Sequence, residues 1–233
     1  MLRRAVPCGA ISDSVGVTMQ TEEDRRESAD EAAPTASLQQ PASPEDSETP
    51  DVAEPLDVSG PSDSSIEIET SVSYPLEVKR DLAGGEDDPS RTHDYKLSWR
   101  PTETHIFVSA KGRKMCHVGL VRQTIEISGA SLDVAGAGGV LVRSGTRGRG
   151  YGRAGMEAAE AFVVREMKIR FMLLFCREAV RPWYDALGWR KVLGATWAEQ
   201  PNGSIVLPLD SMWKSLNGSR WPDGDVYLHS RPW

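Results

Sequence analysis

The chain has few cysteines, and their scarcity argues against two kinds of site. Cys8, Cys116 and Cys176 are the only three in 233 residues, and their spacing matches no metal motif. An odd, sparse set also argues against a disulfide-stapled secreted fold. We therefore expect no bound metal and a reducing, cytoplasmic compartment. Cys176 lies in an apolar run and is expected to be a small buried residue rather than a nucleophile.

Long apolar runs are missing as well. No stretch approaches the roughly 18 apolar residues of a membrane-spanning helix. The apolar start of the chain is interrupted by Pro7 and Gly9, whereas a secretory signal needs a longer unbroken apolar region. The sequence therefore predicts no membrane partner and no secretory signal.

Residues 1–90 are poor in aromatic side chains and in positive charge. Tyr74 is their one aromatic residue, and 21 acidic against 6 basic residues give a net charge of −15. Such a segment buries too little apolar surface to offset the chain entropy of folding, so residues 1–90 are expected to form a disordered acidic tail. Residues 91–233 carry a net charge of +8 and all seven tryptophans, and they are long enough for one hydrophobic core.

The apolar pattern of residues 91–233 predicts an α+β domain. Three strands joined by short polar turns should form an antiparallel meander, and the helix, strand, helix and strand that follow should place one strand parallel to the meander. Where a sheet changes from antiparallel to parallel pairing, neighbouring strands can separate and leave a slot for an extended ligand. The expected elements are strands 105–109, 116–127 and 131–142, a helix from 151 to about 168, strand 169–176, helix 182–187 and strand 204–207.

One glycine-rich segment carries most of the chemical information. Arg147-Gly148-Arg149-Gly150-Tyr151-Gly152 follows an apolar strand and precedes the first helix. Glycines let the backbone approach a ligand closely, and a helix N-terminus offers free N–H groups and a favourable dipole to an anion. The segment therefore predicts a site for a phosphate-bearing ligand.

Two motifs together resemble those of the GNAT acetyltransferase superfamily. The pattern Arg147-x-x-Gly150-x-Gly152 is similar to its acyl-CoA signature, and Tyr184-x-x-x-Gly188-Trp189 is similar to its Tyr-x-x-x-Gly-aromatic segment. The resemblance covers roughly residues 95–233. It is greatest to aminoglycoside 2′-N-acetyltransferases and nodulation-type N-acyltransferases, through residues 117–122, 206–210 and 221–226. The implied fold is a mixed, mostly antiparallel sheet flanked by helices.

The resemblance implies an N-acyltransferase that moves an acetyl group from acetyl-CoA to a primary amine by direct attack. Tyr184 matches the family's general acid, which protonates the leaving thiolate. Backbone groups of Val140, Leu141 and Val142 would bind the pantetheine arm and polarise the thioester carbonyl. The pyrophosphate would lie on the residues of the glycine loop and of the helix start, namely Arg147, Gly148, Arg149, Gly150, Tyr151, Gly152 and Arg153.

The sequence departs from these relatives at the general base. They carry a glutamate on the glycine-rich strand, where this chain has Gly136 and Gly138. Asp210 and Asp225 match acidic substrate-binding positions of the aminoglycoside enzymes, and each either binds a cationic amine or caps a turn. His117 and Glu126 are the other candidates for the base.

The front of the domain leaves several alternatives open. Only residues 66–99 can supply the strand and helices that normally wall the acceptor site, and Ile66-Glu67-Ile68-Glu69 alternates like a weakly pairing strand. The acceptor side is then open, completed by a partner such as a second copy in a homodimer, or degraded.

A catalytically silent CoA-binding module is the alternative function. The loop also resembles an RGG-type segment, but a single copy between structured elements argues against a nucleic-acid partner. A small amine or amino sugar is the expected acceptor.

Overall fold

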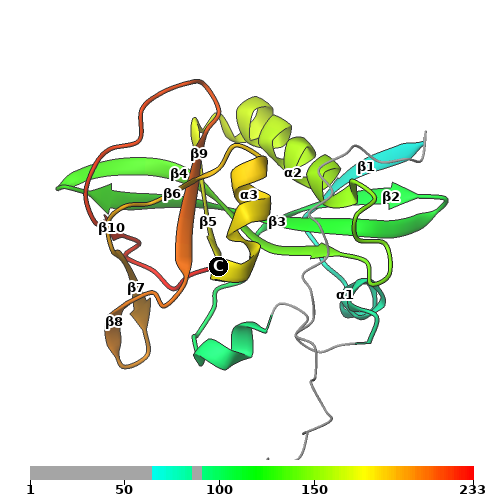
Figure 1. Cartoon of the computed structure of the whole chain (residues 1–233), viewed down its shortest axis with the longest axis horizontal. Coiled ribbons are helices and arrows are strands. Elements are labelled where there is room, and N and C mark those ends of the chain that lie inside the picture. Colours follow the sequence, from blue (N-terminus) through cyan, green and yellow to red (C-terminus); the bar gives the residue numbers. More distant parts are fainter. Residues whose placement is uncertain (1–64, 86–90) are drawn as a thin grey trace, which may run out of the picture. The chain divides into compact units, whose positions relative to one another are not determined.

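The computed structural model describes residues 65–85 and 91–233, which are drawn in colour in Figure 1. Two elements precede residue 91, strand β1 (Ile66–Ser71) and helix α1 (Leu76–Ala83). The following elements are a 3₁₀ turn (Thr92–Tyr95), β2 (Thr104–Ala110), β3 (Arg113–Ile127), β4 (Ala130–Val142), α2 (Tyr151–Phe162), a π-helical turn (Val163–Met167), β5 (Phe171–Cys176), a 3₁₀ turn (Glu178–Val180), α3 (Arg181–Ala186), β6 (Arg190–Lys191), β7 (Thr196–Gln200), β8 (Gly203–Val206), β9 (Asp210–Ser215) and β10 (Val226–Tyr227).

The sheet has the mixed α+β topology that the motifs imply. Its strands follow the order β6-β9-β5-β4-β3-β10-β7-β8, and β1 and β2 extend the other half of β3. β2, β3 and β4 form the expected antiparallel meander. β5 pairs parallel to β4 and antiparallel to β9. The change of pairing at β4 and β5 therefore lies next to the glycine loop, which connects β4 to α2.

The sheet buries a different cluster on each of its faces. The back face, which α2 and α3 cover, includes Val118 and Leu174 and packs on Met156 of α2 and Tyr184 of α3. The front face includes Val134 and Leu173 and packs on the segment that ends at Trp233. Alternating strand residues point to opposite faces, so β4 and β5 contribute to both clusters.

The predicted boundary of the acidic tail at residue 90 needs a correction. Residues 65–85 are folded, because β1 pairs along its whole length with β2, from Ile66 opposite Ala110 to Ser71 opposite His105. α1 buries Leu82 and Ala83, and its Asp81 binds the guanidinium of Arg143 through both oxygens, at 2.9 and 2.5 Å. The expected strand at Ile66 to Glu69 is confirmed as part of β1, whereas the net charge of residues 1–90 conceals α1. The prediction of disorder otherwise falls on residues outside those described.

Candidate functional site

β4 and β5 pair over only three residues and then separate. Ala135, Gly136 and Ala137 lie opposite Met172, Leu173 and Leu174, but β4 continues to Val142 and β5 continues to Cys176. Among the described residues, no strand pairs with the edge of β4 that faces β5 beyond Ala137. Backbone groups of residues 139–142 therefore have no strand partner on this edge. We call this opening the split.

A bulge in β4 fixes the backbone at the split. The register with β3 shifts between His117 and Gly119, and Gly139 adopts a positive φ of 58°. The Gly139 carbonyl accepts a hydrogen bond from His117 Nδ1 at 2.8 Å. Bulges re-aim the backbone of a strand, and this one sets the direction of the N–H and C=O groups that follow it.

His117 belongs to a buried chain of hydrogen bonds. Because its Nδ1 donates to Gly139, its Nε2 in the neutral ring accepts, and His105 Nδ1 donates to it at 3.0 Å. Burial lowers the pKa of His117 to about 4 and also lowers the pKa of His105. The ring of Tyr74 stacks on His117 at 3.8 Å. Tyr74 thus packs on the histidine that binds the bulge. The prediction of a disordered tail over residues 1–90 missed this contact.

The glycine loop has the geometry of an anion site. Gly145, Gly148 and Gly150 all have positive φ, and α2 begins after Gly150 without a side-chain cap. The first N–H groups of α2 therefore lack intrahelical partners. Arg147 and Arg149 are exposed.

Arg153 lies in the first turn of α2, beside the glycine loop. Its Nε is buried and makes no hydrogen bond with any described residue, while its terminal nitrogen lies 3.5 Å from Glu157. The rest of the guanidinium is partly exposed, so Arg153 adds positive charge to the N-terminal end of α2. The loop residues thus fit a pyrophosphate. The described residues contain no group of three or more His, Cys, Asp or Glu side chains arranged to hold a metal ion.

Tyr184 lies behind the split, on the back face. It is 8% exposed, and burial raises its pKa, with smaller contributions from Cys176 and Cys116. Cys176 is the last residue of β5, and Cys116 lies opposite Val142 of β4. The hydroxyl of Tyr184 is therefore protonated at neutral pH and lies near the strand ends that border the split. Cys176 is buried, as predicted, and burial raises its thiol pKa to about 12.

The acidic candidates for binding the amine are held by other contacts. Asp210 is the first residue of β9 and lies opposite Cys176, the last residue of β5. It forms ion pairs with Arg181 at 2.9 Å and with Lys191 at 2.5 Å. Its charge is already compensated, so it offers little to an additional ammonium group.

Asp225 lies far from Tyr184 and from the split. The expectation that Asp225 and Tyr184 belong to one catalytic site is therefore wrong. Its carboxylate accepts a hydrogen bond from the Ala195 N–H at 2.8 Å, so it caps a turn. The next residue, Val226, pairs with Ile127, and Ile127 pairs with Ala130 at the start of β4. The split begins seven residues further along β4, about 23 Å away at the usual rise per residue. Glu126 lies at the same remote end, beside His229 at 3.2 Å.

Trp233 is the residue at the split that sequence reasoning did not find. An ideal Cβ on Gly136 would lie 2.1 Å from its indole, and one on Gly138 would lie 3.0 Å from its carbonyl carbon. Gly136 and Gly138 therefore make room for this tryptophan. Two glycines at alternate positions of a buried strand are the sequence signal, because they leave a groove on one face.

Comparison with known proteins supports the resemblance to acyltransferases. The family model for nodulation protein A (NodA) matches residues 92–199. This range contains the meander, the glycine loop, α2 and α3, and the match supports the resemblance to the nodulation-type acyltransferases. A search of curated proteins finds no significant match.

Solved structures of acetyltransferases are also similar to the chain. A GNAT family N-acetyltransferase from Escherichia coli in complex with CoA is 16% identical, with a TM-score of 0.43, over 72% of this chain and 92% of that chain. A GNAT family acetyltransferase from Brucella melitensis in complex with acetyl-CoA is 15% identical, with a TM-score of 0.42, over 70% of this chain and 96% of that chain. In the described part of the chain, no helix has the length and apolar character needed to cross a bilayer.

The buried histidine pair predicts a pH-dependent stability. The native state excludes a proton from His117, whose pKa is about 4, whereas the ordinary histidine pKa is 6.5. The unfolded chain therefore binds more protons between these values, and stability falls as pH drops from 6.5 to 4. We expect His117 to contribute a loss of roughly 3 kcal/mol at most. Urea unfolding at several pH values measures it.

The His117→Gln variant is the matched control for this titration. Glutamine keeps an N–H donor for the Gly139 carbonyl but does not titrate. The free energy of unfolding of wild type minus that of the variant should fall steadily as the pH drops from 6.5 to 4. Other titrating groups affect both proteins equally and do not contribute to this difference. A constant difference over this range would show that His117 does not carry the effect.

Proposed function

We propose that the chain is an N-acyltransferase that transfers an acetyl group from acetyl-CoA to a primary amine. The observation that carries the proposal is the split between β4 and β5, which opens directly beside the glycine loop at the start of α2. The anion site at the glycine loop continues into the unpaired edge of β4. This arrangement matches a ligand that has a pyrophosphate followed by a long arm with amide groups. The match to nodulation protein A supports the acyltransferase class.

Each part of the site has one task in this reaction. Loop N–H groups, Arg149 and Arg153 bind the pyrophosphate, and the β4 edge at Val140–Val142 binds the arm. Acetyl-CoA supplies an activated acyl group, whose carbonyl oxygen gains charge when the amine attacks. Fixed backbone donors at such an oxygen are the largest single source of catalysis in acyl transfer. The bulge at Gly139, held by His117, sets their direction.

Tyr184 is proposed to protonate the leaving thiolate. Its raised pKa makes full proton transfer to a thiolate of ordinary basicity unfavourable. The same burial that raises the tyrosine pKa also raises the pKa of a thiol in the split. The pKa values of the proton donor and of the thiol therefore remain close to each other. The amine must lose its own proton before attack. The acidic candidates are paired or remote, so the free-base fraction of the acceptor supplies the nucleophile.

A catalytically silent CoA-binding module is the second candidate function. The observation that favours it is the cover of Gly138 by Trp233, at the site of the relatives' glutamate. Under this alternative, acetyl-CoA binds but no amine releases free CoA. A panel of small amines and amino sugars with detection of the free thiol separates the two functions.

Charge reversal at Arg149 should weaken CoA binding strongly. Arg149 is exposed, so Arg149→Glu should leave the fold intact while it turns an attraction for the pyrophosphate into a repulsion. A hydrogen bond to a charged group contributes about 1.5–3 kcal/mol, which predicts a Kd for CoA about 10- to 100-fold higher. Isothermal titration with CoA measures it.

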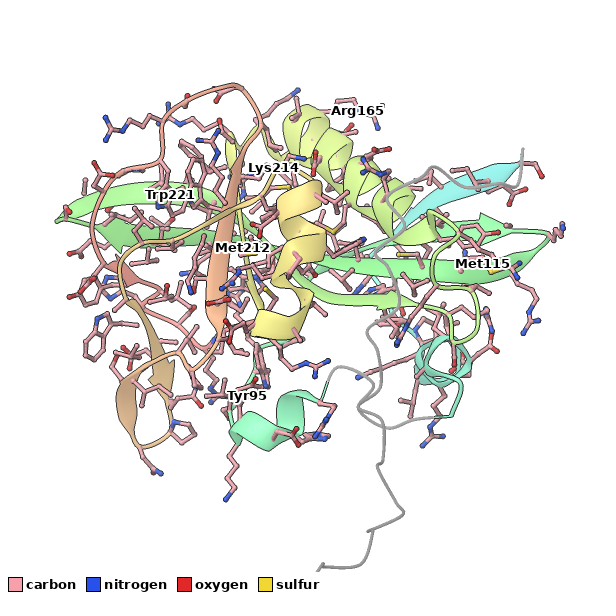
Figure 2. The ribbon with its side chains drawn as sticks, viewed as in Figure 1. Tyr95, Met115, Arg165, Met212, Lys214 and Trp221 are labelled. Atoms are coloured by element: carbon pink, nitrogen blue, oxygen red, sulfur yellow. The ribbon has the colours of Figure 1, made fainter. Side chains whose placement is uncertain are left out.

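Arg165→Glu is the control for this reversal. Arg165 is also exposed, follows the C-terminal end of α2 (Figure 2) and causes the same change of net charge. It should alter the CoA affinity less than about twofold in buffered salt, where charges more than about 10 Å apart are screened. Equal losses in both variants would assign the effect to net charge and remove the loop from the phosphate site.

A further inference from the structure

The apex of the split, where β4 and β5 rejoin at Ala137 and Leu174, is covered on the front face by Trp233. The indole lies over Gly136, and the carbonyl group of the same residue lies over Gly138. Phe175, the first residue of β5 beyond the paired stretch, has its ring 4.9 Å from the indole. Trp233 is 5% exposed. Two aromatic side chains therefore stand in front of the apex.

Backbone hydrogen bonds hold Trp233 in this position. The segment from Leu228 to Trp233 makes contacts on both sides: the Arg100 N–H donates to Pro232 at 2.7 Å, and the Glu199 N–H donates to Ser230 at 2.9 Å. The Gln123 side chain donates to the Leu228 carbonyl at 2.8 Å. Because these donors come from distant parts of the chain, the tryptophan is a fixed wall of the site.

The other directions from the apex are closed as well. In the plane of the sheet, β4 and β5 are hydrogen-bonded to each other. Behind it, Ala137, Leu174 and Tyr184 are buried in the back-face cluster. A chain that runs down the split from the glycine loop thus ends at the apex. From Val140 to Ala137 there are three residues, or about 10 Å of strand.

We infer that Trp233, with Phe175, sets the length of the acyl group and restricts the protein to short acyl chains such as acetyl. The inference rests on the proposed function, which orients the pyrophosphate at the loop and the acyl end toward the apex. An acetyl group ends before the wall, whereas a longer chain must displace the indole. Gly136 is required for this position of Trp233, because any side chain at residue 136 would occupy the space of the indole.

A series of acyl-CoA thioesters tests the inference on the full chain. Binding of acetyl-, butyryl-, hexanoyl- and octanoyl-CoA is measured for wild type, Trp233→Ala, Trp233→Phe and Gly136→Ala. Wild type should bind octanoyl-CoA at least about 10-fold more weakly than acetyl-CoA. Trp233→Ala should shift this ratio at least about 10-fold toward octanoyl-CoA, and Trp233→Phe should lie between. Gly136→Ala should shift it in the same direction, because the new Cβ displaces the unaltered indole.

Trp197→Ala is the matched control. Trp197 stacks on Tyr227 at 6.1 Å in β7, far along the sheet from the split, so its loss should leave the ratio unchanged. If the ratio is unchanged in every Trp233 and Gly136 variant that folds while acetyl-CoA still binds, the inference is overturned and the proposed function stands. If wild type binds no acyl-CoA, both are overturned. A Trp233→Ala variant that fails to fold leaves the decision to Gly136→Ala and Trp233→Phe.

Discussion

Valine at position 150 is expected to abolish measurable binding of acetyl-CoA. Gly150 precedes α2 with φ of 79°, a conformation in which a β-branched residue is strongly strained. Relief of the strain turns the peptide groups at the start of α2, so the N–H groups that face the phosphates lose their common direction. Several charge-assisted hydrogen bonds are lost together, and we expect affinity to fall at least 100-fold. Isothermal titration measures it.

Gly129→Val separates loss of the site from general strain. Gly129 has the same φ of 79° in the turn between β3 and β4, and a Cβ there meets no atom within 4 Å. It should therefore suffer a similar backbone penalty at the remote end of the sheet. The control variant should lose thermal stability but bind acetyl-CoA as wild type does. Equal affinity in the two variants would contradict a phosphate site at α2.

Removal of one hydroxyl at Tyr184 is expected to give the largest loss of rate. Tyr184→Phe keeps the ring that packs on Trp183 at 4.8 Å and on Trp189 at 6.0 Å, so the back-face cluster should persist. A positioned general acid contributes about 10²- to 10⁴-fold, and kcat should fall by this factor. KM for acetyl-CoA should change little, because the hydroxyl acts on the leaving thiolate. Release of free CoA measures both.

Tyr227→Phe is the control for the missing hydroxyl. Tyr227 is partly exposed in β10 and pairs with Glu126 at the far end of β3. Its variant should retain the wild-type kcat. Full activity of Tyr184→Phe would exclude the tyrosine as general acid, and an inactive wild type that still binds acetyl-CoA would favour the silent module.

Local patterns predicted the elements around the glycine loop correctly. The glycine loop, the start of α2 and the meander are contiguous in sequence, and each follows from short-range patterns of glycine and apolar residues. The structure accordingly has β2 to β5, α2 and α3 close to their expected bounds. The separation of β4 from β5 also follows from the change of pairing that the element order predicts.

The acceptor end could not be predicted in this way, because distant segments build it. Trp233 meets Gly136 across almost a hundred residues, and the segment before it has no periodic pattern. Asp225 matched a motif by its place along the chain, but the strand pairing of Val226 puts it at the other end of the sheet. The alternation from Ile66 to Glu69 indicated β1, whereas α1 was hidden by the strong net charge of residues 1–90. Tertiary contacts decide these positions, and composition does not reveal them.

Titration of the full chain with acetyl-CoA tests the central claim most directly. The split and the glycine loop predict one site per chain, with a Kd in the micromolar range typical of such cosubstrates, and loss of binding in Gly150→Val but not in Gly129→Val. Saturating acetyl-CoA should also raise the midpoint of thermal unfolding, because it binds only the native state. No heat of binding and no thermal shift at millimolar acetyl-CoA would contradict the account.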